Sequence, residues 1–591
     1  MPRSALRTKI IATVGPASRS PEMLQQMIEA GLDVIRLNFS HGDQAMHAET
    51  IERVRAASAR VGVPVAILGD LQGPKLRVGQ MSGEGVTLTP NQRITLTTED
   101  GILGEGDLIP VQYDGLPEVL DPGDRILLDD GLLEMLVLDT TPTTITAEVV
   151  IGGVLKSNKG MNLPRASLSI PAITDKDKSD LFFALEHQID WIALSFVRTA
   201  QEVLDLKLMI RQASAFSRPV PVVSKIEKPE AVQNIDEIII ASDAIMVARG
   251  DLAIETSSEE VPIMQKTIIR KCNAAGVPVI TATQMLDSMI RNPRPTRAEA
   301  SDVANAILDG TDAIMLSGET ASGTYPLRTV QMMHSIAQHA ENLLIEGGLR
   351  EYGVEFIKGV AGSVAHATVE TAVELNAAAI ITPTMSGSTA RLLSKYRPSM
   401  PVIATTPSPL VQRQLALYWG VIPLMARRTE TTDEMLDASI RAALEHGLVK
   451  EGDTVVLTAG TAGSPAGSTD LMKVHVIKRI LCSGTGIGNQ TVTGRVRILN
   501  GPLDPALEVE SDEIIVAERT DRTFVGVAQR AAGLITVQPG MNSHAAILAV
   551  EVGIPTIVGV EGAMTVLKDG QVISLDARQG QIIEGRASSA S

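Results

Sequence analysis

The sequence predicts an α/β protein whose largest part is a barrel of eight βα units. Short apolar runs alternate with amphipathic stretches, which is the pattern of strands that are each followed by a helix. Eight such runs occur, three before and five after an interruption of about a hundred residues. Seven of them end in polar residues, and the strand ends of such a barrel meet at the face where barrel enzymes carry their active sites. We therefore expect a TIM (β/α)8 barrel with one shared site at that face.

The first three strands are expected at residues 9–15, 34–40 and 64–70. Ser20 and Pro21 mark the start of a helix between the first two, as its N-cap and first helical residue. The alternation then stops, and short β-like runs separated by Gly and Pro turns follow. These runs predict an inserted β domain over residues 72–169. The alternation resumes in five further strands, at residues 191–197, 220–227, 244–251, 277–285 and 312–320.

We assign the barrel to residues 1–71 and 170–345, and two more domains are expected after it. Five apolar runs within residues 346–480 alternate with helical stretches and predict a second α/β domain. The last segment, residues 481–591, contains apolar runs joined by Gly-rich turns and begins at a linker rich in Gly, Ser and Thr. A chain of 591 residues agrees with several domains, since single cores rarely exceed about 250–300 residues.

Composition argues against several classes of partner. The net charge of −17 disfavours nonspecific binding to nucleic acid or to an anionic membrane. No apolar run approaches the roughly 20 residues that span a bilayer, and the N-terminus lacks the apolar core of a signal peptide. Two cysteines, Cys272 and Cys482, give no basis for a disulfide framework. We expect a cytoplasmic protein with no nucleic-acid or membrane partner.

The polar residues at the strand ends have the chemistry of a phosphoryl-transfer site. Glu227 and Asp251 end neighbouring strands, and two carboxylates suit Mg²⁺ or Mn²⁺. Lys225 and Arg36 add the positive charge that a transferring phosphoryl group requires. The alternatives are a charge-balanced ring that supports the loops and, for Lys225 and Glu227, a local salt bridge. The remaining candidates are the hydroxyls of Thr283 and Ser317, the carboxylate of Glu319, and Gly250, which lets a ligand approach the backbone.

Six motifs, in this order, resemble those of the pyruvate kinase family: RLNFSHG, SKIE, MVARGDL, TATQML, PTRAEASDVANA and MLSGETASGTYP. The resemblance covers about residues 1–480. The interruption matches the family's mobile B domain, which implies that it is a β-barrel lid. The second α/β domain matches the family's regulatory C domain. The resemblance implies the last step of glycolysis, in which phosphoenolpyruvate and ADP give pyruvate and ATP with Mg²⁺ or Mn²⁺ as cofactor. It also implies a homotetramer built through barrel and C-domain contacts.

The resemblance assigns catalytic and substrate-binding roles to residues of these motifs. Lys225 would stabilise the phosphoryl group in flight, and Arg36 would bind the phosphate. Glu227 and Asp251 would hold Mg²⁺, which bridges the enolate and phosphate oxygens of the substrate.

A second group of residues would act at the substrate carboxylate, at the enolate and at the nucleotide. Gly250 and Thr283 would contact the carboxylate region. Thr283, or a water relay with Ser317 and Glu319, would help to protonate the enolate. Lid closure would bring Lys159 to the site and exclude water. The residues implied to contact the nucleotide are Asn38, Phe39, Ser40, His41, Arg77 and Lys159.

K⁺ is predicted not to be required. The family's K⁺ site would be formed here by Asn38, Ser40, Asp70 and the carbonyl of Leu71. Lys75 stands where many members of the family have Glu, and members with this Lys tend not to need K⁺. Its ammonium group can supply the positive charge locally. The alternative is a surface lysine without such a role.

A phosphate site is expected at a helix N-terminus in the C domain. Ser386, Gly387, Ser388 and Thr389 lead into this helix, and small hydroxyl residues with free N–H groups bind phosphate in such positions. An ordinary helix cap is the alternative. In the family this loop binds a phosphorylated effector, and a Gly-rich loop, here residues 458–469, closes over it. The resemblance therefore implies allosteric control by a sugar phosphate or a nucleoside monophosphate.

The segment QPGMNSHAAILAVEVGIPTIVG, residues 538–559, resembles the swivelling phosphohistidine domain of phosphoenolpyruvate-utilising enzymes. His544 matches the histidine that is phosphorylated in those enzymes, whereas Asn542 replaces the usual Thr. The partner domains of a phosphotransfer synthase are not evident elsewhere in the chain. We interpret residues 481–591 as a non-catalytic extra domain.

Two other functions compete with this interpretation. The first is another barrel enzyme acting on a pyruvate-like acid, such as an aldolase, but the lid and Lys159 argue against it because an aldolase needs no nucleotide site. The second is a catalytically silent sensor that keeps only the effector site. The retention of Lys225, Glu227, Asp251 and Thr283 argues against this sensor.

Overall fold

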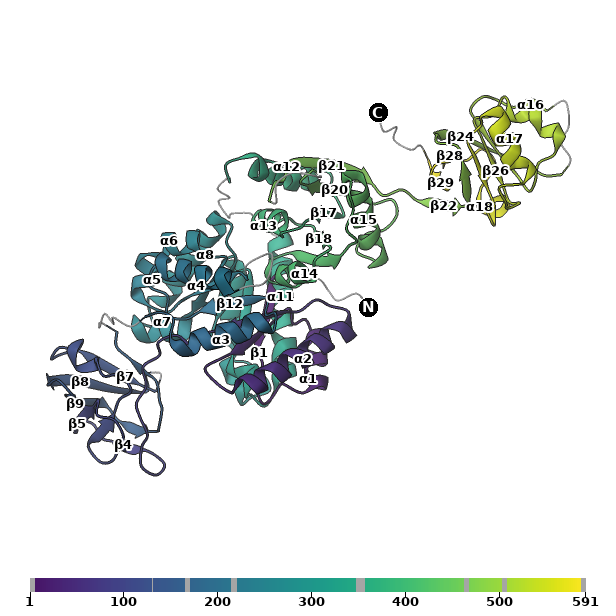
Figure 1. The fold of residues 1–591 in the computed structure, drawn as a ribbon. Helices are drawn as coiled ribbons and strands as arrows, with labels where there is room; N and C mark the ends of the chain where they lie inside the picture. The colour runs from purple at the N-terminus through teal and green to yellow at the C-terminus, as the bar shows by residue number, and fades with distance from the viewer. Residues whose placement is uncertain are drawn as a thin grey trace. The chain divides into compact units, whose positions relative to one another are not determined.

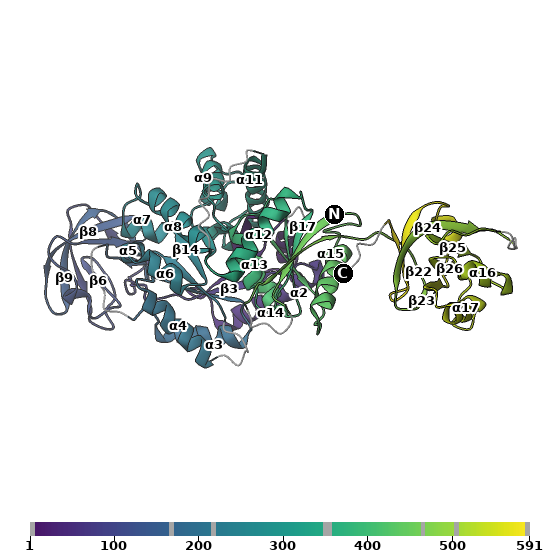
Figure 2. The same ribbon diagram turned by 90° about the horizontal axis from the view of Figure 1, so that it is seen from above.

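The structure is a computed structural model of the 591-residue chain. It describes residues 6–129, 131–164, 171–213, 220–346, 357–461, 467–501 and 507–585. The chain divides into two compact units (Figure 1, Figure 2). The first comprises Met1–Ala443 and Val456–Lys473, and the second comprises Leu444–Val455 and Val474–Ser591.

Eight parallel strands close into the predicted barrel, in the order β1-β16-β15-β14-β13-β12-β3-β2. The register aligns the strand ends, since Asn38 of β2 pairs with Asp70 of β3, which pairs with Ala193 of β12. Polar residues at these ends therefore share one rim. The strands are β1 (Lys9–Thr13), β2 (Val34–Asn38), β3 (Ala66–Asp70), β12 (Trp191–Leu194), β13 (Val222–Ile226), β14 (Ala244–Ala248), β15 (Val279–Ala282) and β16 (Ala313–Leu316).

Two hydrophobic cores hold the barrel together, because successive strand residues point to opposite faces. Ile11 and Val34 belong to the core inside the barrel. Their neighbours Ile10 and Ile35 belong to the larger core between the strands and the surrounding helices.

Helices cover the outside of the barrel, and their ends follow local sequence signals. The first helix begins as predicted, with Pro21 at its first position and the Ser20 hydroxyl accepting a hydrogen bond from the Met23 amide. The helices are α1 (Pro21–Glu29), α2 (Gln44–Val61), α3 (Asp175–Glu186), α4 (Ala200–Ala213), α5 (Pro229–Gln233), α6 (Ile235–Ala241), α7 (Arg249–Glu255), α8 (Val261–Ala275), α9 (Arg297–Leu308), α10 (Gly318–Ala321) and α11 (Pro326–Glu346).

The insertion after β3 is an all-β lid with its own hydrophobic core, as the sequence predicts. It forms a curled half-barrel from a six-stranded sheet, in the order β11-β7-β8-β9-β5-β6, and a two-stranded sheet of β10 and β4. The strands are β4 (Val86–Leu88), β5 (Arg93–Thr97), β6 (Leu108–Pro110), β7 (Arg125–Leu128), β8 (Leu133–Thr140), β9 (Thr144–Ile151), β10 (Gly153–Leu155) and β11 (Met161–Asn162).

The second α/β domain contains a five-stranded sheet, in the order β19-β18-β17-β20-β21. It packs against the barrel through Asp190, whose buried carboxylate pairs with Arg55 at 2.8 Å and with Arg413 of the α/β domain at 2.7 Å. The elements are β17 (Ala379–Pro383), β18 (Val402–Thr406), β19 (Val421–Met425), β20 (Thr454–Ala459), β21 (Leu471–Val476), α12 (Val360–Glu374), α13 (Ser388–Lys395), α14 (Pro409–Gln414) and α15 (Thr432–Glu445).

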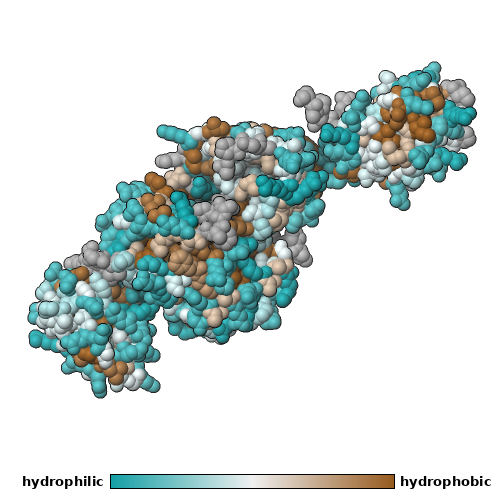
Figure 3. All heavy atoms as spheres, in the orientation of Figure 1, coloured by the Kyte–Doolittle hydropathy of each residue, from teal (hydrophilic) through white to brown (hydrophobic). Residues whose placement is uncertain are grey.

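The last domain is built on an eight-stranded sheet, in the order β22-β29-β28-β24-β25-β26-β27-β23. Apolar side chains gather on its face over α16 and α17 (Figure 3), where Val525, Ile547 and Val550 are exposed. Its elements are β22 (Ile480–Ser483), β23 (Thr485–Ile487), β24 (Thr491–Leu499), β25 (Glu513–Ala517), β26 (Gly533–Thr536), β27 (Thr556–Val558), β28 (Val572–Asp576), β29 (Gln581–Glu584), α16 (Val525–Ala528), α17 (His544–Val552) and α18 (Ala563–Val566).

Within the part of the chain that the structure describes, no helix is long and apolar enough to cross a bilayer.

Candidate active site

A cleft of about 630 Å³ opens between the carboxyl ends of the barrel strands and the lid. Its volume lies within the range of about 300–1,000 Å³ that is typical of small-molecule sites. Ten of the predicted site residues line it, so the structure brings together side chains from the barrel and the lid. They are Arg36, Asn38, Ser40, His41, Lys75, Arg77, Lys159, Lys225, Glu227 and Asp251.

Lys225 lies at the centre of a charged network beneath this cleft. Its ammonium nitrogen is 3.1 Å from Glu227 Oε1 and 3.3 Å from Asp70 Oδ1, and it donates a hydrogen bond of 2.7 Å to Ser195 Oγ. Arg36 Nε donates to Asp70 Oδ2 at 2.7 Å. The local salt bridge between Lys225 and Glu227 is therefore present, but it is one part of a larger network that also orients Arg36.

Burial and charge oppose each other in this network. Burial alone would raise the pKa of Asp70, but Lys225 and Arg36 outweigh it and the pKa is lowered. Burial would lower the pKa of Lys225, but Asp70 and Glu227 outweigh it and the pKa is raised. Lys225 therefore carries a positive charge at neutral pH, directly under the cleft.

The carboxylates of Glu227 and Asp251 have the donor chemistry of a divalent-metal site. Burial raises the pKa of Glu227, with the Asp251 charge adding to this effect and Lys225 opposing it. Glu227 Oε2 accepts a hydrogen bond of 2.7 Å from the Phe196 amide, which fixes its orientation. A cation between the two carboxylates would relieve their repulsion, and oxygen ligands suit Mg²⁺ and Mn²⁺. The residues present fit such a metal.

The residues predicted to protonate the enolate form a second group, at the ends of β15 and β16. Thr283 Oγ1 accepts a hydrogen bond of 2.7 Å from the Gly250 amide and donates one of 2.6 Å to the Ala282 carbonyl. Glu319 accepts hydrogen bonds from the amides of Ser317 and Leu286 at 2.7 and 3.1 Å.

This second group has two features of a reactive site. Thr283 has a φ of +68°, a conformation that strains a β-branched residue. Burial raises the pKa of Glu319, although its backbone hydrogen bonds lower it in part. Thr283, Ser317, Glu319 and Gly250 are not among the residues that line the cleft itself.

The remaining predicted residues lie around the network in different ways. The Phe39 side chain is 2% exposed and packs edge-on against Phe183, so it belongs to the barrel core. The Leu71 carbonyl accepts a hydrogen bond of 2.7 Å from Ser195 Oγ. Lys159 on the lid pairs with Asp129 at 2.7 Å. The Lys75 ammonium is 3.5 Å from Asp251 Oδ1, beside the proposed metal ligands.

Sequence reasoning missed several residues of this site. Ser195 is the clearest case, since it links Lys225, Asp70 and Leu71 through one hydroxyl. Its position directly after β12 was a signal, but a lone serine after a strand is too common to single out. The other lining residues not predicted are Gln72, Asp129, Asn158, Gly160 and Phe196.

Comparison with known proteins agrees with this geometry. Three family profiles match the chain: "Pyruvate kinase, barrel domain" over residues 5–330, "Pyruvate kinase, alpha/beta domain" over 362–475, and "PEP-utilising enzyme, mobile domain" over 509–580. The pyruvate kinase of Geobacillus stearothermophilus is 46% identical over 589 residues, which cover 98% of this chain and 99% of the relative.

The chain belongs to the pyruvate kinase family. The pyruvate kinase of Bacillus licheniformis is 44% identical over the same coverage, and pyruvate kinase 2 of Synechocystis sp. is 46% identical over 98% of this chain and 97% of the relative. A solved pyruvate kinase from Cryptosporidium parvum has a TM-score of 0.74 at 38% identity and covers 80% of this chain and 96% of its own. The activity is that of a pyruvate kinase, EC 2.7.1.40.

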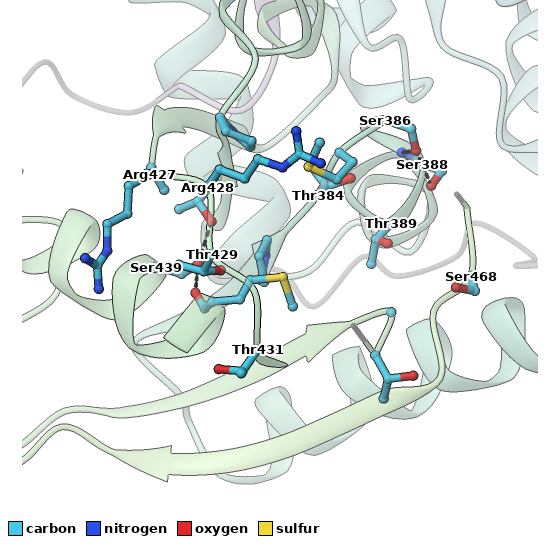
Figure 4. A pocket seen from close by; sticks show the side chains of 18 of the residues that line it. Thr384, Ser386, Ser388, Thr389, Arg427, Arg428, Thr429, Thr431, Ser439 and Ser468 are labelled. Atoms are coloured by element: carbon cyan, nitrogen blue, oxygen red, sulfur yellow. Dashed lines mark hydrogen bonds between the residues drawn. The ribbon is translucent and has the colours of Figure 1, made fainter. Parts of the chain in front are cut away.

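A second pocket lies in the pyruvate kinase C domain, at the carboxyl ends of its parallel strands (Figure 4). Ser386, Ser388 and Thr389 line it, and Gly387 is the N-cap of α13 with a φ of +80°. Thr389 Oγ1 shares a hydrogen bond of 2.8 Å with Thr469 Oγ1, which ties the helix to the end of the Gly-rich loop. Residues 462–466 of that loop lie outside the described residues.

Two arginines in this pocket were not predicted. Arg427 and Arg428 follow β19, and both belong to the lining. Figure 4 shows the Arg428 side chain pointing toward Thr384 and the start of α13, whereas Arg427 points away from them. Positive charge therefore faces the helix N-terminus, which suits an anionic ligand.

In the last domain, His544 begins α17, directly after the capping residue Ser543. Its ring nitrogen Nδ1 is 2.9 Å from Thr520 Oγ1. This hydrogen bond holds the ring at the start of the helix.

Proposed function

We propose that the barrel cleft transfers the phosphoryl group through Lys225, Arg36 and a divalent metal held by Glu227 and Asp251. The observation that carries this proposal is the position of the Lys225 ammonium, which is held by Asp70 and Glu227 at the base of the cleft. When bound, the metal would supply positive charge that stabilises the phosphoryl and enolate oxygens. Arg36, oriented by Asp70, would bind the phosphate of the substrate.

The residues around this centre supply the rest of the reaction. The phosphoryl group leaves the enol oxygen of phosphoenolpyruvate for the β-phosphate of ADP, and the enolate takes up a proton at its methylene carbon. We assign the delivery of this proton to Thr283 or to a water relay with Ser317 and Glu319, whose raised pKa suits proton holding. The backbone at Gly250 would contact the substrate carboxylate.

The nucleotide would lie on the lid side of the cleft, where the positive charge is concentrated. Arg77 and Lys159 line this side, and Asn38, Ser40 and His41 line the barrel side. Burial lowers the pKa of His41, and the charges of Arg77, Arg36 and Lys75 lower it further. His41 is therefore neutral, and it does not repel these cations. Their positive charge remains available to the phosphates of the nucleotide.

Replacement of Lys225 by Met tests the proposed centre. We expect kcat to fall at least about a hundredfold, because a positive charge aimed at the transferring group is lost, while the KM for phosphoenolpyruvate changes little. The measurement is a lactate dehydrogenase-coupled assay with phosphoenolpyruvate and ADP. Lys225→Arg, which keeps a cation beside Asp70 and Glu227, controls for disruption of the buried network. A near-normal kcat in the folded Met variant would leave the pair as a structural salt bridge.

Three further properties extend this proposal. We infer that Lys75 replaces K⁺, since its ammonium lies beside Asp251 at the rim of the site. We infer that the C-domain pocket binds a sugar phosphate or nucleoside monophosphate that regulates the enzyme. We also infer a homotetramer.

We propose that the last domain takes no catalytic part, although its fold resembles a phosphohistidine domain. Asn542 replaces the usual Thr, and the Thr520 hydrogen bond gives His544 a structural role at the start of α17. Incubation with ³²P-labelled phosphoenolpyruvate is expected to leave no acid-labile label on the protein. Label that disappears in His544→Gln would show that the histidine accepts the phosphoryl group.

A further inference from the structure

The motif PTRAEASDVANA, residues 295–306, contains none of the residues that the proposed reaction uses. Most of it forms α9, on the outside of the barrel. One of its side chains, Asp302, nevertheless reaches the loop that carries Thr283 through a single arginine, Arg249. This contact connects three of the six motifs, since Arg249 belongs to MVARGDL and Thr283 to TATQML.

The guanidinium group of Arg249 binds acceptors on two sides. Its Nη1 donates to both carboxylate oxygens of Asp302, at 2.9 and 2.7 Å. Its Nη2 donates to the Thr283 carbonyl at 2.8 Å, and its Nε donates to the Ala282 carbonyl at 3.3 Å. The Arg249 side chain is 11% exposed, so water competes little for these bonds. A planar guanidinium group can join a carboxylate to two carbonyls in one geometry, which an ammonium group cannot do.

The backbone of Thr283 needs such a restraint. Thr283 and the next residue, Gln284, have φ values of +68° and +53°, a region that residues with side chains rarely adopt. A strained conformation of this kind persists only where the surrounding structure holds it. The Gly250 amide donates to Thr283 Oγ1 at 2.7 Å, and Arg249 donates to the Thr283 carbonyl. The first two residues of α7 therefore hold both the side chain and the backbone of Thr283.

A second carboxylate of the same motif holds the turn that follows Thr283. Glu299 accepts hydrogen bonds from the amide and the hydroxyl of Ser288, at 2.7 and 2.5 Å. Ser288 belongs to the turn Asp287–Ile290 after β15. Helix α9 therefore restrains the loop after β15 at two points, directly at Ser288 and through Arg249 at Thr283.

We propose that Asp302 and Arg249 are positioning residues that hold the Thr283 hydroxyl in place for proton transfer to the enolate. This inference rests on the proposed role of Thr283. Asp302 fixes the guanidinium group, which fixes the Thr283 carbonyl and so keeps the hydroxyl beside the Gly250 amide. Neither Asp302 nor Arg249 lines the cleft, so both act through Thr283 and not on the substrate.

Hydrogen exchange at the methyl group of pyruvate isolates the proton step. In the reverse of that step, the enzyme with Mg²⁺ and ATP removes a methyl proton from pyruvate, and a deuteron from D₂O replaces it when the enolate is protonated again. The methyl signal in ¹H NMR measures the rate. We expect Asp302→Asn to slow the exchange at least about tenfold, because a small displacement of a reacting group is costly. Arg249→Lys, which keeps the charge but loses the planar fork, should slow it at least as much.

The control is Asp309→Asn, at the C-terminal end of the same helix. Asp309 pairs with Lys266 of α8, so this substitution removes a carboxylate of α9 that contacts neither Arg249 nor the loop after β15. The exchange rate of Asp309→Asn should equal that of the wild type.

A Thr283→Ala background separates positioning from a general structural role. Thr283→Ala should itself slow the exchange, and Asp302→Asn should add little in that background, since no hydroxyl remains to be positioned. Titration with Mn²⁺, followed by electron paramagnetic resonance, should give the same dissociation constant for Asp302→Asn and the wild type. The substitution lies outside the proposed metal ligands Glu227 and Asp251.

Three results would overturn the proposal. They are a normal exchange rate in either Asp302→Asn or Arg249→Lys, an undiminished loss when Asp302→Asn is added to Thr283→Ala, and weakened Mn²⁺ binding in Asp302→Asn. Normal exchange in Thr283→Ala would refute the role of Thr283 and the positioning with it. Normal exchange in Asp302→Asn beside slow exchange in Thr283→Ala would refute the positioning alone.

Discussion

Lys75 is the residue on which the predicted K⁺ independence of the enzyme depends. Its ammonium lies 3.5 Å from Asp251 Oδ1, and both residues line the cleft that also contains Lys225 and Glu227. The Coulomb attraction between two opposite unit charges at this distance amounts to several kcal/mol at the effective dielectric constant of about 20 that applies near protein surfaces. Screening by solvent reduces this attraction for side chains that are partly exposed. Lys75 can therefore supply locally the positive charge that a bound K⁺ would provide.

We predict that the wild-type kcat is nearly the same in KCl and in tetramethylammonium chloride, and that Lys75→Glu makes it depend on K⁺. In the variant we expect KCl to raise kcat by at least about tenfold, a difference of ~1.4 kcal/mol in the barrier. The coupled assay at matched ionic strength measures both. Lys75→Met, which removes the charge without reversing it, is expected to give a smaller dependence.

A large KCl activation of the wild type would contradict the assignment to Lys75. So would a Lys75→Glu variant whose kcat is equal in the two salts.

At the scale of residues, the sequence predicted the charged centre well and its connections poorly. Lys225 and Glu227 lie two residues apart on one strand, so their shared face followed from β geometry alone. Ser195, which donates to the Leu71 carbonyl and accepts from Lys225, could not be inferred in this way. Its hydrogen-bond partners Lys225, Leu71 and Asp70 are 30, 124 and 125 positions away in the sequence. Such contacts depend on the closed barrel and on no local pattern.

At the scale of elements, the C-domain pocket combines one predicted helix start with one unpredicted loop. The hydroxyl residues before α13 gave a local signal, because a phosphate site needs small residues and free amides in sequence. Arg427 and Arg428 gave none, since two arginines after a strand commonly form a solvated surface. The sheet order β19-β18-β17 brings the end of β19 to the same edge as the end of β17.

We predict that Arg428→Ala raises the effector concentration needed for half-maximal activation by at least about tenfold, because a charge-assisted contact to phosphate contributes about 1.5–3 kcal/mol. Arg427→Ala is the matched control, since its side chain points away from α13 (Figure 4) and should change this concentration little. A panel of sugar phosphates and nucleoside monophosphates, assayed at subsaturating phosphoenolpyruvate, identifies the effector first.

Ser386→Ala and Thr389→Ala are expected to abolish the effector response and to spare the basal kcat. Thr389 has a second effect, because its hydroxyl also binds Thr469 and so holds the end of the Gly-rich loop. Ser386→Ala alone is therefore the cleaner variant. An unchanged response in Ser386→Ala, or equal effects of the two arginine variants, would place the effector elsewhere.

At the scale of the whole molecule, the order of domains could be predicted because the periodicity changes along the chain, from strand and helix to strand and turn and back. The barrel and C domain repeat strand and helix, whereas the lid repeats strand and turn. The closure of eight strands followed from their count, and the structure confirms it. The pocket of about 40 Å³ between the lid and the barrel could not be predicted, since Leu76 and Asn162 belong to the lid and Glu230 and Glu255 to helices that follow different barrel strands. Only the folded chain places these residues around one space.

The edge of the C-domain sheet is a candidate contact surface between subunits. β21 is the last strand in the order β19-β18-β17-β20-β21, and among the described residues its outer side pairs with no further strand. Its apolar side chains are exposed, with Met472 at 40%, Val474 at 45% and Val476 at 56%. A long apolar edge is prone to pair with a strand of another chain, and a two-fold axis permits the same strand of a second copy to do so.

We predict that Val474→Lys halves the mass of the assembly. The wild type should elute as a tetramer of 62.7 kDa chains, joined in part across β21. A lysine at this position places like charges face to face across the two-fold axis and should leave dimers held by their barrel contacts, because charged residues on an edge strand oppose pairing. Size-exclusion chromatography with light scattering measures the mass. Leu132→Lys, at a 70% exposed position on the lid, adds the same charge away from this edge and should leave the tetramer intact. A wild type that is monomeric, or a Val474→Lys variant of unchanged mass, would show that the exposed edge does not join the subunits.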